Sequence, residues 1–218
     1  MVLYKHSDSP KTNAPISSNL YTQLQKDILT GKLKSGQKLT EQTICEAYQV
    51  SRTPVREALR QLEAEGLVEN ILNRGSFVVG LSRQDFEDIF QLRKIYEIQA
   101  VKWAIERITE EEMDALDETF EFMEFYTLRN DIDKMLTINE GFHQIIYEAS
   151  HNRMLQQLLS SYQVYLKYLR KDDEYPDDYL STVLEEHRKI FQAFIEKDVE
   201  AGAEAMEMHI NNSKKRRL

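Results

Sequence analysis

The scarcity of glycine and proline after the first third of the chain is the feature that most constrains the fold. Beyond Leu81, only Gly141, Gly202 and Pro176 interrupt the sequence up to Leu218. Glycine and proline form most tight turns, so a segment with so few of them is poorly suited to a fold of many short strands. Apolar residues here instead recur every three or four positions, which is the period of an amphipathic helix. Long helices are therefore expected.

Residues 81–218 are accordingly predicted to form an all-α bundle of about six helices. The first helix should run to about Arg107 and begin at Ser82, because Asp85 three residues later completes a capping pair. The caps expected for later helices are Thr109 with Glu112, Asn152, and either Asp178 or Ser181 after Pro176.

The N-terminal part shows a different order of elements. Residues 1–16 are polar and without a period, which indicates a flexible arm. Residues 17–80 then predict helix, helix, turn, helix and β-hairpin, the order of a winged helix-turn-helix. Its second helix should bury Ile44 and Ala47. The three helices and two strands are expected at residues 18–30, 40–48, 51–65, 67–69 and 76–79. The chain is thus an α-rich protein of two domains.

Charge is unevenly placed along the chain. The net charge is -9, but residues 1–80 carry 10 basic and 8 acidic residues, whereas residues 81–218 carry 18 and 29. A basic head on an acidic body permits DNA binding at the head. The single cysteine, Cys45, excludes an internal disulfide, and no apolar run is long enough to span a membrane. We expect a cytoplasmic protein without a membrane partner.

The third predicted helix carries the features of a DNA recognition helix. Ser51 should cap it, and its apolar face leaves Arg52, Thr53 and Arg56 exposed near its start, where such a helix meets base edges in the major groove. Arginine can bind guanine through two hydrogen bonds, and Pro54 fits the first helical turn. The alternative is an ordinary solvated face.

The loop of the hairpin is a second candidate contact. Arg74 lies at its tip beside the permissive Gly75 and could enter the minor groove or touch phosphate. Turn, capped helix, paired arginines and wing together favour DNA binding over the solvated face.

Residues 20–79 resemble the DNA-binding domain of the GntR family of bacterial regulators. The matching strings are Gly31-Lys32-Leu33-Lys34-Ser35-Gly36-Gln37-Lys38-Leu39, SRTPVREALRQLEAEGLVE at 51–69, and Arg74-Gly75-Ser76-Phe77-Val78. Ser35 stands where the family usually has proline, and Gln42 stands where it often has a DNA-contacting arginine. The residues that the resemblance and the pattern assign to DNA are Ser51, Arg52, Thr53, Pro54, Arg56, Gln42, Arg74 and Gly75.

Four polar residues of the second half could hold a metal ion. Asn139 and His143 are four apart and so project from one helix face, while His187 and His209 lie in apolar settings on later helices. Three imidazoles and one oxygen suit a divalent transition metal such as Zn²⁺, Ni²⁺ or Mn²⁺. Taken singly, each histidine is more often a hydrogen-bonded core or boundary residue than a metal ligand.

Residues 82–210 resemble the all-α effector domain, called FCD, of the FadR-type branch of the same family. The matching motifs are Arg93-x-x-x-Glu97, Asn139-x-x-Phe142-His143, Glu186-His187 and Met208-His209-Ile210. The resemblance implies a metal held by Asn139, His143, His187 and His209, and a small organic acid as effector. Asn139 replaces the usual aspartate, which should weaken metal binding because the amide is neutral. Arg93 is either a second anchor for the acid or an ion-pair partner of Glu97.

These features predict a homodimeric transcription regulator that binds an operator in double-stranded DNA and is controlled by a small carboxylate. We do not expect an enzyme. The alternative is a metal-dependent α-helical enzyme with a DNA-binding head, although the chain lacks the H-E-x-x-H spacing of metalloproteases. An unregulated architectural DNA binder would leave the histidines of the bundle unexplained.

Overall fold

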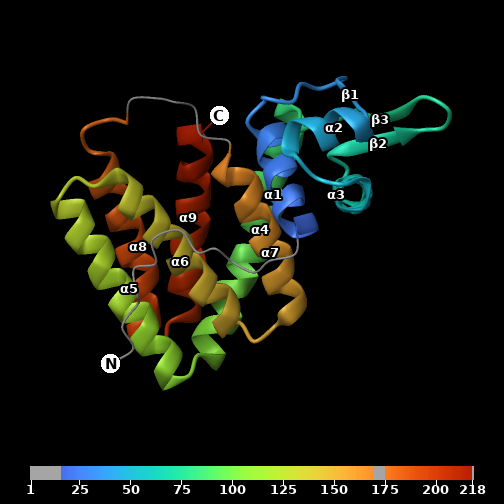
Figure 1. Ribbon diagram of the computed structural model, residues 1–218. Coiled ribbons are helices and arrows are strands. Elements are labelled where there is room, and N and C mark those ends of the chain that lie inside the picture. The colour runs from blue at the N-terminus through green and yellow to red at the C-terminus, as the bar shows by residue number, and fades with distance from the viewer. Residues whose placement is uncertain (1–15, 169–174, 218) are drawn as a thin grey trace. The chain divides into compact units, whose positions relative to one another are not determined.

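The computed structural model describes residues 16–168 and 175–217. The chain divides between Leu81 and Ser82 into two compact units, coloured from blue to green and from green to red in Figure 1. Most of the expected N-terminal arm, residues 1–15, lies outside the described residues, and Ile16 is the first residue of a helix.

The N-terminal unit is a winged helix-turn-helix, as predicted. Its sheet has the order β1-β3-β2 and is antiparallel throughout, with Glu69 of β2 opposite Phe77 of β3. Strand β1 was not expected, since two residues are too short for a sequence period. The elements are α1 (Ile16–Leu29), β1 (Lys38–Leu39), α2 (Glu41–Tyr48), α3 (Arg52–Ala64), β2 (Val68–Ile71) and β3 (Gly75–Val78).

The core of this unit lies mainly between α1 and α3. Leu24 of α1 and Val55 and Leu62 of α3 are fully buried because each lies on the apolar face of its helix. In α2 the expected burial of Ile44 is found, but that of Ala47 is wrong, since Ala47 is exposed. Helix α2 packs mainly against α3, and Ala47 lies on its exposed side.

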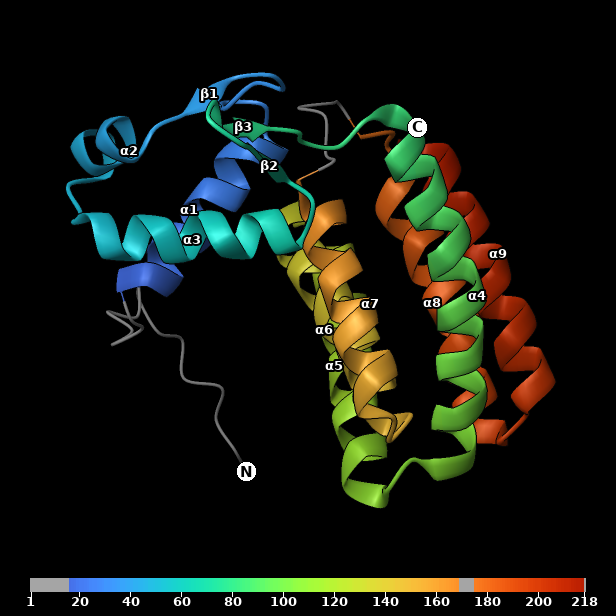
Figure 2. The same ribbon diagram turned by 90° about the vertical axis from the view of Figure 1, so that its right-hand side faces the viewer.

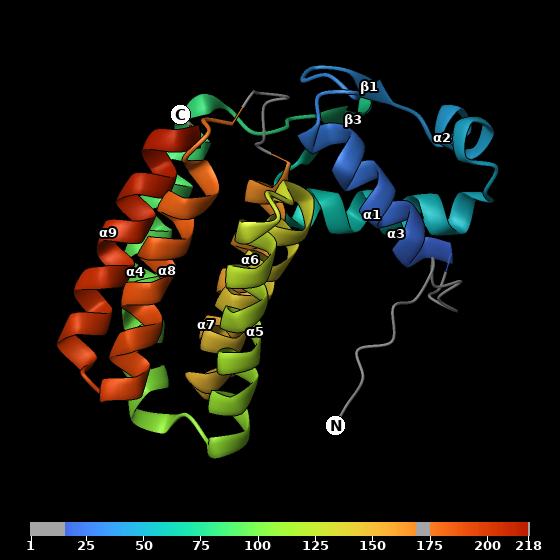
Figure 3. The ribbon, with the colours of Figure 1, turned by 90° about the vertical axis from the view of Figure 1, so that its left-hand side faces the viewer.

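The C-terminal unit is the predicted helical bundle, with six helices among its described residues. Helices α4, α8 and α9 lie on one side and α5, α6 and α7 on the other, as Figures 2 and 3 show from opposite directions. No described helix is long and apolar enough to cross a membrane. The helices are α4 (Arg83–Arg107), α5 (Glu110–Leu128), α6 (Ile132–Ala149), α7 (Arg153–Lys167), α8 (Tyr179–Glu196) and α9 (Val199–Arg217).

The helix starts follow local capping signals. The Ser82 and Thr109 side chains each accept a hydrogen bond from the backbone N–H three residues later, and both form complete capping boxes. The Asn152 side chain caps α7 in the same way. Of the two candidates for α8, Asp178 takes the cap position, although its side chain makes no capping hydrogen bond.

Close packing joins the first and last helices of the bundle. Gly202 of α9 lies against α4 so tightly that an added Cβ would approach Ile105 Cδ1 to 2.5 Å and Val101 Cγ1 to 2.9 Å. This contact sets α9 beside α4 and brings the face of α9 that carries His209 into the bundle interior, where His209 is buried.

Candidate functional site

Helix α3 presents the predicted DNA-binding residues on its solvent side. Ser51, Arg52, Thr53 and Arg56 are exposed and Pro54 is half-buried, while the opposite face packs into the core. Ser51 takes the N-cap position, but its hydroxyl makes no capping hydrogen bond. The first N–H groups of a helix bind phosphate well, so this end of α3 is suited to the DNA backbone.

Contacts with α2 hold one of the two arginines of this face. Arg56 Nε donates a hydrogen bond of 2.6 Å to Glu41 Oε1, although the Arg56 side chain is 66% exposed. The hydrogen bond from Arg56 lowers the pKa of the Glu41 carboxyl. Gln42, also exposed, donates to Glu46 Oε1 at 2.9 Å. Arg56 is therefore oriented by Glu41 before any DNA is present.

The wing carries its own basic group. Arg74 is exposed at the hairpin loop, and its guanidinium lies 5.8 Å from the centre of the Phe77 ring. Gly75 has a φ of 97°, which is unfavourable for other residues, and an added Cβ would lie 3.3 Å from Lys38 Cε. The glycine thus permits the turn that exposes Arg74.

Three of the four predicted metal ligands come together inside the bundle. His143 of α6, His187 of α8 and His209 of α9 are buried, and one ring nitrogen from each lies within 4.8 Å of the others. The Nε2 atoms of His143 and His209 are 3.2 Å apart. Residues separated by up to 66 positions therefore converge on one point.

The Nδ1 atoms of His187 and His209 have hydrogen-bond acceptors, and a carboxylate lies near that of His143. His187 Nδ1 lies 2.7 Å from the carbonyl oxygen of Val183, His209 Nδ1 lies 2.9 Å from Glu186 Oε2, and His143 Nδ1 lies 3.0 Å from Glu97 Oε2. Because a carbonyl and a carboxylate only accept, Nδ1 carries the proton in neutral His187 and His209, and their Nε2 atoms present lone pairs. His143 Nδ1 and Glu97 Oε2 are close but do not meet hydrogen-bond geometry, and His187 Nε2 is buried with no hydrogen-bond partner among the described residues.

Electrostatics favour the neutral imidazoles of His187 and His209. Burial, reinforced by the charges of the neighbouring rings, places the pKa of His187 well below its ordinary value. Burial also lowers the pKa of His209 to about 4, in spite of its hydrogen bond to Glu186. A neutral imidazole whose N–H is held by an acceptor is the form that binds a metal.

The two other predicted residues of this site are placed differently. Asn139 lies one turn before His143 on α6, on the same side of the helix, and is half-buried. Arg93 is buried and its Nε donates to Glu97 Oε1 at 2.6 Å, so the ion pair that was the alternative to effector binding is present. Burial raises the pKa of Glu97, but Arg93 and His143 outweigh it and bring the value to about 2.

Two carboxylates beside the histidines, Glu97 and Glu186, were not predicted as site residues. Glu97 links Arg93 to His143, and Glu186 accepts from His209, so each helps to fix a ring. Glu186 precedes His187 directly, but its partner His209 lies 23 residues away. Both glutamates stood in the family motifs, which was the one signal that could have found them.

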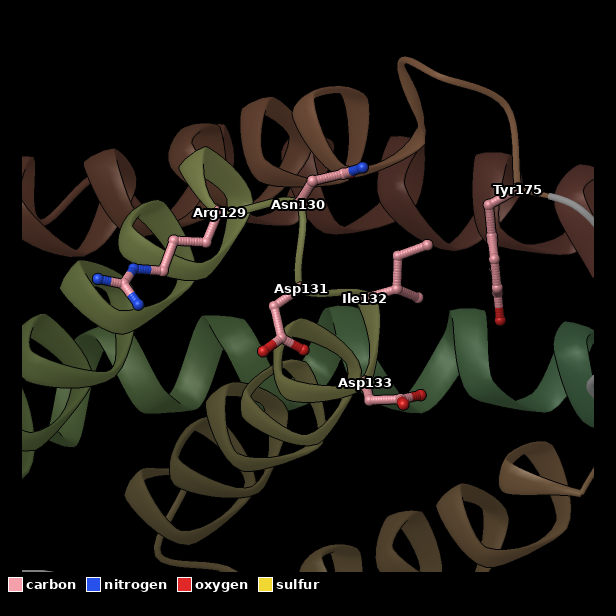
Figure 4. Close-up of a pocket in the computed structure, with 6 residues that line it drawn as sticks. All are labelled: Arg129, Asn130, Asp131, Ile132, Asp133 and Tyr175. Carbon is pink, nitrogen blue, oxygen red and sulfur yellow. The ribbon is translucent and has the colours of Figure 1, made fainter.

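A separate surface hollow lies where α5 turns into α6. Asp131 and Asp133 line it together with Tyr175, which approaches from the segment before α8 (Figure 4). None of the six lining residues belongs to the histidine cluster, and the Asp131 carboxylate already caps α6 by accepting from Lys134 N. The buried histidines, not this hollow, are the candidate ligand site.

A winged helix-turn-helix with exposed arginines, joined to an all-α unit, defines a DNA-binding transcription regulator. Comparison with known families agrees: residues 16–78 match the bacterial regulatory proteins of the gntR family, and residues 88–212 match the FCD domain. The chain belongs to the GntR family and carries an FCD domain.

Similar proteins are named as transcription regulators, and the match covers most of each chain. The HTH-type transcriptional regulator YdhC of Bacillus subtilis is 31% identical over 91% of this chain and 89% of its own. The HTH-type transcriptional repressor RspR of Escherichia coli is 25% identical over 90% and 86%. The solved structure of E. coli McbR/YncC has the same fold, with a TM-score of 0.71, 22% identity, and coverage of 93% of this chain and 96% of its own.

Proposed function

We propose that this regulator binds its operator with an affinity set by a small carboxylate, which binds at a divalent metal ion in the helical unit. The observation that carries the metal is the convergence of three buried imidazoles, two of which are held through Nδ1 by an acceptor and so direct Nε2 lone pairs into the cluster. Lone pairs directed at one another repel, and a cation between them removes that repulsion.

His143, His187 and His209 would hold the metal, with the Asn139 side-chain oxygen as a fourth ligand. Imidazole suits Zn²⁺ and Ni²⁺ better than Mn²⁺, so we favour the first two ions. The amide of Asn139 adds no charge, which should lower the affinity but leave the bound metal with its full positive charge. The metal would supply that charge and its remaining coordination positions to the carboxylate of the effector.

We propose that Arg93 also binds the effector, by exchanging its present partner, Glu97, for the carboxylate of the ligand. Its guanidinium is already bound to Glu97, so an acidic ligand would have to replace that carboxylate. Because Glu97 also faces His143, such an exchange would connect effector binding to a metal ligand.

DNA binding is assigned to α3, α2 and the wing. Arg52 and Arg56 are proposed to contact base edges, while Ser51, Thr53 and the start of α3 at Pro54 would contact phosphate. Gln42 of α2 and the wing residues Arg74 and Gly75 would complete the DNA-binding surface.

Control by the ligand follows if the protein is a homodimer. A twofold dimer places two recognition helices on two half-sites, and DNA affinity then depends on their spacing. A ligand that binds one spacing better than another shifts the dimer toward it by its difference in affinity. The proposal therefore requires a dimer whose DNA affinity changes with ligand.

Metal content tests the site. Purified wild type should contain about one zinc or nickel ion per chain, and His143→Ala and His187→Ala should contain none, as measured by elemental analysis. His151→Ala is the matched control, because His151 is exposed and pairs with Glu112 instead. A screen of small carboxylates for a rise in melting temperature, with and without metal, then identifies the effector class. Absence of metal from wild type after dialysis against zinc would refute the site.

Binding to a duplex selected from random sequences tests the DNA face. Arg52→Ala and Arg56→Ala should each weaken specific binding by about 10-fold or more, since a bidentate contact to guanine is worth ~1–3 kcal/mol. Arg60→Ala, on the same helix and paired with Glu57, is the control that should bind like wild type. Equal binding by all four proteins would refute the assignment.

The alternative of a metal-dependent enzyme is not favoured by the contacts. Hydrolysis by a metal-bound water commonly uses a nearby carboxylate as the general base that takes the proton. Glu97 and Glu186, the carboxylates placed beside the histidines, are each occupied by an arginine and an imidazole.

A further inference from the structure

The last turns of α9 are fastened to the histidine cluster through one carboxylate of α8. Glu186 Oε2 lies 2.9 Å from His209 Nδ1 and accepts from Arg216 Nη2 at 2.7 Å, while Oε1 accepts from Asn212 Nδ2 at 2.9 Å and from Arg216 Nη1 at 2.8 Å. The Glu186 side chain is only 9% exposed. Four N–H groups thus surround a nearly buried carboxylate.

These donors share one face of α9. His209, Asn212 and Arg216 are separated by three and four residues, so they follow one another along successive turns of the helix. The Arg216 guanidinium binds both oxygens at once, which fixes the plane of the carboxylate as a single donor could not.

We propose that Glu186 is the positioning residue that sets the ring of His209 for metal binding, and that Arg216 and Asn212 hold Glu186 in place. The C-terminal turns of α9 and the metal site are then coupled: ordering one favours the other, by the same factor in both directions. This inference rests on the proposed metal site. It also gives a role to Arg216, one of four consecutive basic residues at 214–217.

The coupling predicts effects on metal affinity from residues that do not touch the metal. Loss of a partner that orients a metal-binding imidazole typically lowers metal affinity about 10- to 100-fold. We expect Glu186→Gln to reach this range, because an amide cannot accept from all four donors. Arg216→Ala should lower the affinity by about 10-fold or less, because Glu186 keeps Asn212 and His209 but loses its fixed plane.

Zn²⁺ titration against a chromophoric chelator tests the proposal on the full-length protein. Wild type, Glu186→Gln, Arg216→Ala and Arg216→Lys are compared, with Lys215→Ala as the matched control, since Lys215 is exposed on the neighbouring position. Lysine at 216 keeps the charge but not the paired hydrogen bonds, so it should restore only part of the affinity. Circular dichroism shows whether each variant is folded, and Arg216, 24% exposed near the end of α9, can be replaced without opening the core.

Hydrogen exchange distinguishes coupling to the metal site from a purely structural role of Arg216. Zn²⁺ should slow amide exchange at residues 212–216 in wild type and in Lys215→Ala, but much less in Arg216→Ala. Wild-type zinc affinity together with wild-type protection in Arg216→Ala and Glu186→Gln would overturn the coupling and leave the metal site standing. Failure of wild type to bind Zn²⁺ would instead overturn the metal site, and the coupling with it.

Discussion

Arg93 and Glu97 form a buried ion pair whose disruption should destabilise the helical unit. The Arg93 side chain is 6% exposed and that of Glu97 is 0% exposed, so Arg93→Ala leaves a carboxylate in the core without its guanidinium. Burial raises the pKa of Glu97, yet Arg93 and then His143 bring it from 4.5 to about 2. At 1.36 kcal/mol per pKa unit, that shift corresponds to roughly 3 kcal/mol. Breaking a buried pair costs a similar ~3–5 kcal/mol.

We therefore expect Arg93→Ala to lower the free energy of unfolding by about 3 kcal/mol at pH 7. Urea denaturation followed by circular dichroism, with chelator present so that metal binding does not contribute, measures the change. The lowered pKa stabilises the fold only while Glu97 is ionised. The difference in free energy of unfolding between Arg93→Ala and wild type should therefore be full above pH 4.5 and shrink as the pH falls toward 2.

The same helix offers a matched control. Arg83 and Glu87 have the same spacing of four residues, but their contact is 3.5 Å and the Arg83 side chain is 76% exposed. Arg83→Ala should therefore change stability by less than ~0.5 kcal/mol. Adding Glu97→Gln to Arg93→Ala should recover part of the loss, since a buried amide costs less than a buried charge. A loss below ~1 kcal/mol for Arg93→Ala, or no recovery in the double variant, would refute this account of the pair.

Two further perturbations test the packing of the bundle and the charge of the N-terminal unit. Gly202→Ala should destabilise the protein by about 1–3 kcal/mol, because its Cβ would lie 2.5 Å from Ile105 Cδ1. Gly141→Ala, where a Cβ meets nothing within 4 Å, should be neutral or stabilising by up to ~1 kcal/mol; equal melting temperatures for both variants would contradict the packing argument. Burial raises the pKa of Asp27, but hydrogen bonds from Tyr48, Lys32 and Gln23 outweigh it and lower the value, so the stability that this contributes should be lost as the pH falls below 3.8. The urea midpoint of Asp27→Asn should accordingly change less between pH 5 and pH 3 than that of wild type, and an equal change would contradict this reasoning.

Local chemistry explains which elements were predictable. The capping pairs at Ser82 and Thr109 act over three residues, so they mark helix starts in any context. The apolar face of α3 repeats with the helical period and therefore indicates which arginines stay exposed. Strand β1 and the exposure of Ala47 could not be foreseen, because both depend on what packs against a segment only a few residues long.

The features of the candidate sites likewise divide into those that the sequence predicted and those that depend on the tertiary structure. The sequence alone determined the two-domain class, the exposed arginines of α3 and the histidines worth testing, since each follows from spacing or from a family motif. Only the tertiary structure decided that the histidines meet, that Arg93 is bound to Glu97, and that Arg216 holds Glu186. Packing of α6, α8 and α9 brings together histidines up to 66 positions apart, and no local pattern in the chain encodes that proximity.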